Sequence, residues 1–317
     1  MSDLPRAVAP GLGKPTADET WLGGSHPATR GAAGRLSPAR HARNVALIAQ
    51  LTFLEAYRRW VLWAVALLGS AFVALFAIGF FFIHREVTQQ SRVGEVVEVS
   101  DFILLAGLYA AYFLVVVLAL LTSIDTISGE IASGRIHTVV TKPVGRGDIV
   151  AGKWLGFAAM LTVFAAVLCG SIIGVVWLIA DYLPPSPVQG VALIILAGLV
   201  VLSLSILGGT RLTTLTNGIA VFMLYGLAFI GGWIEQFGAF LQNQTAVNIG
   251  IVISLLMPAE AMWKRAAYEM QPASMRLLVI HPMAAVTSPS NVMVAYTVLY
   301  VAVAVAAAVV LFRRRDL

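Results

Sequence analysis

One segment of the chain has the spacing of a phosphate-binding loop. Gly147, Gly152 and Lys153 fit the pattern G-x-x-x-x-G-K. The following position must be Ser or Thr to bind Mg²⁺, and here it is Trp154. Such a loop should also follow a hydrophobic strand, whereas this segment follows a proline turn and leads into a long apolar run. The segment 11–16, GLGKPT, fails for similar reasons, so we expect no nucleotide site in this chain.

Other residues capable of chemistry are few and scattered. The chain has five histidines and a single cysteine, Cys169. The histidines form no H-E-x-x-H motif or close pair, and one cysteine supports neither an intramolecular disulfide nor a thiolate metal site. The predicted membrane spans carry no ionisable side chain in their central parts, where ion relays need one. We therefore predict that the chain by itself is no enzyme, and we expect no catalytic residue, metal or cofactor in it.

The densest charge lies in a connector, 125–156, between two long apolar runs. Only 12% of the whole chain is charged. Charge concentrated between two spans is typical of a folded, water-exposed contact surface. The charged residues of the connector are Asp125, Glu130, Arg135, Lys142, Arg146, Asp148 and Lys153.

The pattern inside this connector predicts one short helix. Gly134 is a natural terminator for the helix that continues from the preceding span. Ile136, Val139 and Val140 then share one face at helical spacing, and Pro143 ends the short helix. A helix with one apolar face would fit a groove on a partner. The alternative is an ordinary polar loop whose apolar spacing arose by chance.

The connector resembles the first cytoplasmic loop of the type-2 ABC exporter permeases. The likeness rests on Glu-x-x-x-Gly (130–134), on the turn Lys-Pro-Val-x-Arg (142–146) and on aliphatic-x-Gly-Lys (150–153). It is similar to the permeases of the nitrous-oxide-reductase-maturation type. The resemblance implies that this loop is a coupling helix that docks on a separate ATPase. The coupling residues predicted in this way are Glu130, Gly134, Ile136, Val139, Val140, Pro143, Arg146 and Lys153.

Composition predicts the fold class. The chain is 59% hydrophobic with a mean hydropathy of +0.87, too apolar for a soluble protein of 317 residues. A span needs about 20 apolar residues, and six runs qualify. The segment 248–257 is too short and is expected to be re-entrant, interfacial or a buried stub. We predict an all-α polytopic membrane protein, with a permease domain over 44–317. Its six expected spans are 60–83, 102–124, 154–180, 188–210, 212–234 and 292–312.

The distribution of basic residues predicts the orientation. Lys and Arg gather before the first span, in the connector and in 313–315, whereas the connection 181–187 has none. The positive-inside rule then places both termini in the cytoplasm and the segment 235–291 outside. The net charge of +5 reflects this bias, and we expect no nucleic-acid partner. The predicted location is the bacterial cytoplasmic (inner) membrane, with multiple passes.

The N-terminal region divides into two predicted parts. Residues 1–43 are rich in Ala, Gly, Pro and Arg, and we expect a disordered tail. Leu47, Ile48, Leu51 and Leu54 share a helical face within 44–59, which predicts an amphipathic helix in the headgroup layer. The stretch LTFLEAYRRWVL resembles the interfacial helix of type-2 permeases. The alternative is a cytoplasmic extension of the first span.

Three further features concern helix ends and helix packing. Asp148 is expected to cap the third span. The pairs Gly152/Gly156 and Gly170/Gly174 are small-xxx-small patterns that allow a second helix to approach, although such pairs are common by chance in apolar sequence.

The last outside segment contains a candidate helix, 258–270. Pro258 opens it and Glu260 lies in its first turn. One interpretation is an interfacial helix anchored by Trp263 and Lys264. The other is an extracytoplasmic lid or docking site for a substrate or a partner.

These patterns lead to one functional expectation and one alternative. We expect the membrane subunit of an ATP-driven ABC-type exporter, with ATP and Mg²⁺ bound by a partner ATPase subunit. Six spans form half of a usual transporter, so a homodimer or a pair with a sister permease is implied within the lipid bilayer. The alternative is a permease-like scaffold that transmits ATPase motion to an extracytoplasmic partner without moving a solute. The transported substrate is not predicted.

Overall fold

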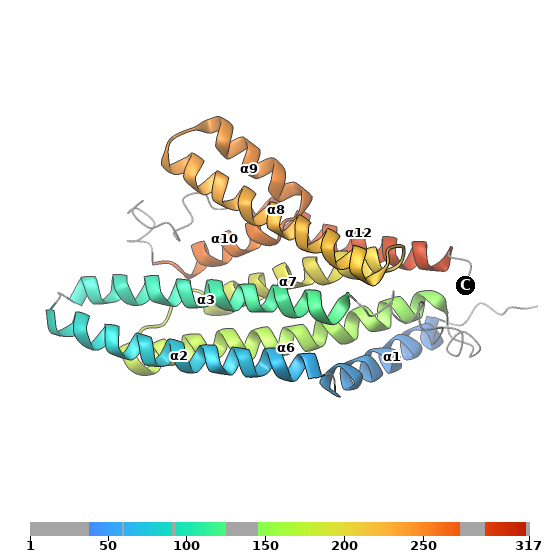
Figure 1. Cartoon of the computed structure of the whole chain (residues 1–317), viewed down its shortest axis with the longest axis horizontal. Helices are drawn as coiled ribbons and strands as arrows, with labels where there is room; N and C mark the ends of the chain where they lie inside the picture. The colour runs from blue at the N-terminus through green and yellow to red at the C-terminus, as the bar shows by residue number, and fades with distance from the viewer. Residues whose placement is uncertain (1–37, 59, 91–92, 125–144, 273–288, 315–317) are drawn as a thin grey trace, which may run out of the picture. The chain divides into compact units, whose positions relative to one another are not determined.

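The computed structural model describes residues 38–58, 60–90, 93–124, 145–272 and 289–314 (Figure 1). This part of the chain is all-helical, with nine helices and no strand. The predicted disordered tail lies outside the described residues except for its last six positions. The helices are α1 (Pro38–Arg58), α2 (Trp60–Gln90), α3 (Val93–Ser123), α6 (Arg146–Ala180), α7 (Pro187–Gly209), α8 (Thr214–Phe240), α9 (Gln244–Leu256), α10 (Ala259–Met270) and α12 (Asn291–Arg313).

Six of these helices are long and apolar enough to cross a membrane: α2, α3, α6, α7, α8 and α12. They correspond to the six predicted spans and confirm them as candidate spans by length and composition. The helices extend beyond the predicted limits because polar residues at the ends of an apolar run continue the same helix. α8, for example, ends at Phe240 rather than at Ile234.

α3 and α7 are the most enclosed of these candidate spans. Just over half of the most apolar stretch of each is buried, against 11% for α2. α2 therefore lies at the periphery, and its exposed apolar side chains are suited to contact with lipid.

Toward one side of Figure 1, the ends of α3 and α12 lie near the starts of α6 and α8.

α1 packs closely along the start of α6 (Figure 1). A Cβ added at Gly152 would lie 2.6 Å from Ile48 Cβ, and one added at Gly156 would lie 2.7 Å from the Ala49 carbonyl oxygen. The glycine pair thus allows the two helix backbones to approach, as the small-xxx-small pattern predicts.

The opposite face of α1 carries the three leucines of the predicted apolar stripe. The fourth predicted member, Ile48, instead packs over Gly152 of α6. Leu47, Leu51 and Leu54 are all exposed in the chain. An exposed apolar stripe on a helix that precedes the first span is suited to the membrane interface. α1 begins at Pro38, six residues before the predicted start, and ends at Arg58.

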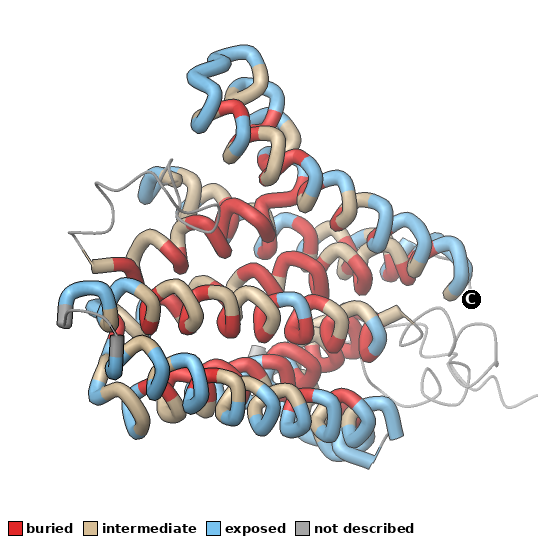
Figure 2. Tube along the Cα trace, turned by 60° about the vertical axis from the view of Figure 1, so that its left-hand side comes forward, coloured by how far each residue is buried: buried red, intermediate tan, exposed pale blue. Residues whose placement is uncertain are grey.

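α8 and α9 form a tight antiparallel hairpin, which is the mostly pale-blue projection at the top of Figure 2. A Cβ at Gly231 would lie 2.5 Å from the Ile253 side chain, and one at Gly238 would lie 2.7 Å from Ala246 Cβ. Gln242 has a φ of 55°, and the Asn243 side chain caps the first turn of α9. The predicted short segment 248–257 is therefore part of a helix, and its many exposed residues show that it is not a buried stub.

The chain turns by 111° between α9 and α10, as a broken span or a re-entrant loop would. Because α9 ends at this break, its last carbonyl groups have no hydrogen-bond partner within the helix. Two tyrosines of α12 satisfy them: Tyr296 donates to the Leu255 carbonyl at 2.7 Å, and Tyr300 to the Leu256 carbonyl at 2.8 Å. These hydrogen bonds occupy carbonyl groups that the end of α9 leaves without a helical partner.

Candidate functional site

Most of the predicted coupling residues fall outside the described part of the chain. These residues are Glu130, Gly134, Ile136, Val139, Val140 and Pro143, so the short coupling helix stays a prediction. Arg146 is the first residue of α6. Lys153 lies two turns further along α6 and is buried, and its predicted role in coupling is likewise untested.

The start of α6 forms the last part of the connector, which the structure describes from residue 145 onward. Its N-cap is Gly145, and no side chain caps it. Asp148 is therefore not the cap that we expected. It lies in the first turn, where a negative charge still favours the positive end of the helix dipole.

Asp148 instead connects α6 to α1. His41 Nδ1 lies 2.9 Å from Asp148 Oδ2, and the carboxylate is almost fully buried while the imidazole is about half exposed. No sequence pattern indicates this contact, because the two residues are far apart in the chain and neither belongs to a motif.

α12 and α7 reach the same turns of α6. The Arg313 guanidinium lies over Gly147, where an added Cβ would be 2.6 Å from Arg313 Nε. Trp154, the residue that disqualifies the phosphate-loop pattern, donates from Nε1 to Ser203 Oγ at 2.9 Å. The first turns of α6 thus contact three other helices, α1, α7 and α12.

A second candidate site is buried between α3, α8 and α10. Lys264 Nζ lies 2.7 Å from Glu235 Oε2, and both side chains are less than a tenth exposed. Glu260, also buried, accepts hydrogen bonds from the Tyr112 hydroxyl at 3.3 Å and from the Tyr109 hydroxyl at 3.4 Å. We name Glu235, Glu260 and Lys264 the buried charge cluster.

Aromatic rings surround this cluster. Trp263 stacks on Tyr112 with ring centres 5.8 Å apart and meets Tyr109 at 4.9 Å. Tyr225 of α8 lies beside Tyr112 at 6.4 Å. The rings exclude water from the carboxylates and hold α10 against α3 and α8.

The burial of α10 corrects one interpretation of the sequence. Trp263 and Lys264 are 4% and 6% exposed, so they do not anchor an interfacial helix. The helix itself was predicted well, with Pro258 as its N-cap and Glu260 in its first turn. The missed signal was the i, i+4 spacing of Glu260 and Lys264 among small and apolar residues, which places both charges on one face.

A further buried carboxylate, Asp101, lies in α3 just before the predicted start of that span. The Tyr182 hydroxyl donates to it at 2.8 Å. Burial, and then the nearby negative charge of Asp101, raises the pKa of Tyr182 well above its ordinary value. Tyr182 therefore remains a hydrogen-bond donor at any physiological pH and fixes the connection between α6 and α7.

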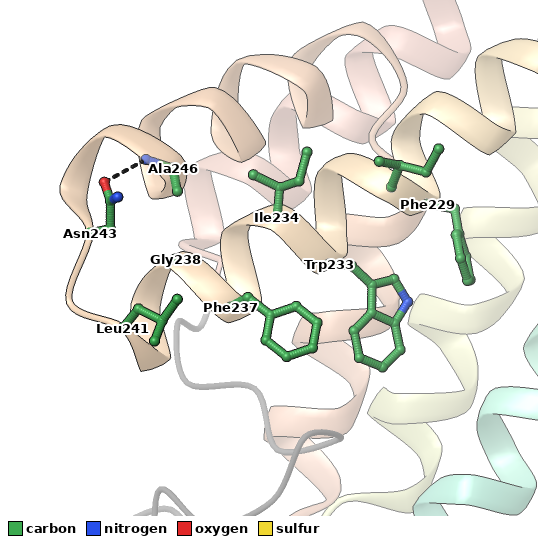
Figure 3. Close-up of a pocket in the computed structure, with 9 residues that line it drawn as sticks. Phe229, Trp233, Ile234, Phe237, Gly238, Leu241, Asn243 and Ala246 are labelled. Atoms are coloured by element: carbon green, nitrogen blue, oxygen red, sulfur yellow. Dashed lines mark hydrogen bonds between the residues drawn. The ribbon is translucent and has the colours of Figure 1, made fainter.

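A hollow of about 380 Å³ opens on the α8–α9 hairpin (Figure 3). Phe229, Trp233 and Phe237 follow one face of α8 along it, and Leu241 and Ala246 line its end. The lining is almost entirely apolar, which suits lipid chains or apolar solutes and provides no acid, base or nucleophile. Within the described ranges, no group of three or more His, Cys, Asp or Glu residues could hold a metal ion.

Six long apolar helices, together with the bent helix pair α9 and α10, define a multi-pass integral membrane protein. The model of the ABC-2 family transporter proteins matches residues 46–317. The chain therefore belongs to the ABC-2 transporter family, whose members form the membrane subunits of ABC transporters and normally pair with an ATPase subunit. No individual curated protein matches the sequence.

Proposed function

We propose that this permease subunit belongs to an ATP-driven exporter and is coupled to its ATPase through the connector 125–153. The partner subunit would bind ATP and Mg²⁺. The observation that carries this proposal is the position of the start of α6, which forms the last part of the connector and contacts α1, α7 and α12. A conformational change of the ATPase that displaces the connector would therefore move several helices together.

The orientation belongs to the same proposal. Both termini and the connector would lie in the cytoplasm of a bacterial inner membrane, with the α8–α9 turn outside. The grouping of the ends of α3 and α12 with the starts of α6 and α8 toward one side of Figure 1 supports this topology. The excess of Lys and Arg in the segments next to these helix ends supports it as well.

A complete transporter would contain two copies of this chain or this chain and a sister permease. α6 retains an open face for such a partner. A Cβ added at Gly170 or Gly174 would meet nothing within 4 Å. Within the described part of the chain, no helix packs against this pair of glycines.

The substitution Val139→Asp tests the coupling. Burying one aliphatic side chain contributes roughly 1.5–3 kcal/mol, and a tenfold change in affinity corresponds to about 1.4 kcal/mol. We expect at least a tenfold loss of affinity for the ATPase in copurification, because the variant also places an unpaired carboxylate in the groove. The amount of permease in the membrane should not change.

Thr138→Asp is the matched control, because it adds the same charge beside the apolar face rather than on it. Equal binding of the ATPase by both variants would contradict the coupling role of this face.

Reconstitution with the ATPase then separates export from the scaffold alternative. An exporter requires stimulation of ATP hydrolysis by a solute, whereas a scaffold requires stimulation only by an extracytoplasmic partner.

A further inference from the structure

The buried charge cluster contains two carboxylates and one ammonium group. Lys264 makes its direct ion pair with Glu235, at 2.7 Å. Within the described ranges, no cationic group lies within 4.0 Å of the Glu260 carboxylate, whose hydrogen bonds come from Tyr109 and Tyr112. The positive charge of Lys264 is therefore engaged by the other carboxylate.

The surroundings of Glu260 oppose a second negative charge. Its side chain is 4% exposed, and the backbone of α8 lies directly against it, since a Cβ at Gly232 would be 2.5 Å from Glu260 Cγ. The hydrogen bonds at 3.3 and 3.4 Å are long for bonds from a hydroxyl to a carboxylate. An unpaired charge is costly in such a place, and a buried carboxyl group usually binds a proton instead.

The titratable and charged groups that face Glu260 come from three helices. They are Tyr109 and Tyr112 of α3, Tyr225 and Glu235 of α8, and Lys264 of α10. The tyrosines are uncharged, and the Lys264 ammonium group makes its direct contact with Glu235, although its charge also acts on Glu260. The charge balance between α10 and its neighbours therefore depends on Glu260.

We propose that Glu260 is a proton-binding site: it holds a proton in the packed arrangement, and loss of that proton releases α10 from α3 and α8. The proton leaves from the carboxylic acid to solvent as α10 separates, which leaves a carboxylate that water then stabilises. Permease opening would thereby depend on pH, a property that coupling to an ATPase does not by itself require.

A cysteine at Ala267 reports the release of α10. Ala267 is 1% exposed in this helix, and Ala267→Cys adds one sulfur atom. In a Cys169→Ser background, the full chain in lipid nanodiscs would be labelled with a maleimide between pH 5.5 and 8.5. Thiol reactivity itself rises with pH, so each rate is divided by the rate of the same reporter combined with Glu260→Gln. This amide stands in for the protonated acid and cannot ionise.

We expect this ratio to rise by up to tenfold per pH unit, because the ionised fraction of a single acid rises by that factor below its midpoint. Glu269→Gln is the matched control on the same helix, and it should leave the rise unchanged. Gly232→Val should give fast labelling at every pH, because its side chain displaces Glu260 mechanically. A ratio that does not change with pH would overturn the proposal.

Infrared difference spectroscopy tests the proton directly. At pH 6 the parent protein should show a carboxylic acid C=O band that disappears in Glu260→Gln and remains in Glu269→Gln. Absence of a band that depends on Glu260 would show that this residue is ionised in the packed state, and the proposal would then be wrong whatever the labelling result.

Discussion

The α1–α6 junction and the buried charge cluster both join segments that are distant in sequence, but they are stabilised differently. At the junction, two glycines bring the helix backbones together, and one contact between Asp148 and a half-exposed histidine lies at its edge. In the buried charge cluster, an ion pair that is nearly inaccessible to solvent connects α8 to α10.

This difference predicts which kind of substitution destabilises each region. A junction built on small residues is weakened by added volume and is nearly insensitive to charge. A buried ion pair is weakened most when one partner is removed, because the remaining charge has no water to stabilise it. Three substitutions therefore distinguish the two regions, and they follow in order of expected effect.

Lys264→Met should have the largest effect. Removing one partner of a buried ion pair typically costs about 3–5 kcal/mol, since Glu235 would lose the buried positive charge of Lys264. The free energy of unfolding in mixed micelles measures this loss. The double variant Glu235→Gln, Lys264→Met should recover most of it, because no uncompensated charge remains. If the double variant is as unstable as the single one, packing rather than charge holds α10.

Gly152→Leu should have an intermediate effect, of about 1–3 kcal/mol. The new side chain would overlap Ile48 and separate α1 from α6. Amide hydrogen exchange along α1 would reveal this separation as faster exchange confined to that helix. Gly170→Leu is the control on the same helix and should leave α1 protected. A loss of assembly in Gly170→Leu alone would identify the open face of α6 as a contact with another subunit.

Asp148→Asn should have the smallest effect on stability. Ion pairs with a solvent-exposed partner contribute about 0–1 kcal/mol, and His41 is about half exposed. A double-mutant cycle with His41→Ala measures the coupling energy between the two side chains. A coupling well above 1 kcal/mol would mean that the junction depends on charge as much as the buried charge cluster does.

Much of the fold could be predicted from local pattern. Runs of apolar residues specify spans one by one, because each span must satisfy its backbone hydrogen bonds within its own helix. The six candidate spans, the helix after Pro258 and the close approach at Gly152 and Gly156 all follow from such local rules. The N-cap of α6 at Gly145 does not follow from these rules. Asp148 also has a side chain suited to capping, but in the structure it contacts His41 instead.

The candidate sites divide in the same way. The connector was recognisable in sequence because its charges and its proline turn are contiguous. The buried charge cluster was missed because Glu235, Glu260 and the two tyrosines of α3 come from three separate helices. In the sequence, Glu235 lies just after a predicted span, the tyrosines lie inside another, and Glu260 lies in the segment expected outside. Only the packing of α10 against α3 and α8 brings them together.

The sequence by itself thus determined the membrane class, the family and the number of candidate spans, since these depend on composition and on contiguous motifs. The tertiary structure alone decided which charges are paired and which helix faces are covered. The physical reason is that burial depends on neighbours from elsewhere in the chain. The 111° turn between α9 and α10 brings Lys264 to Glu235 and leaves Glu260 to the tyrosines.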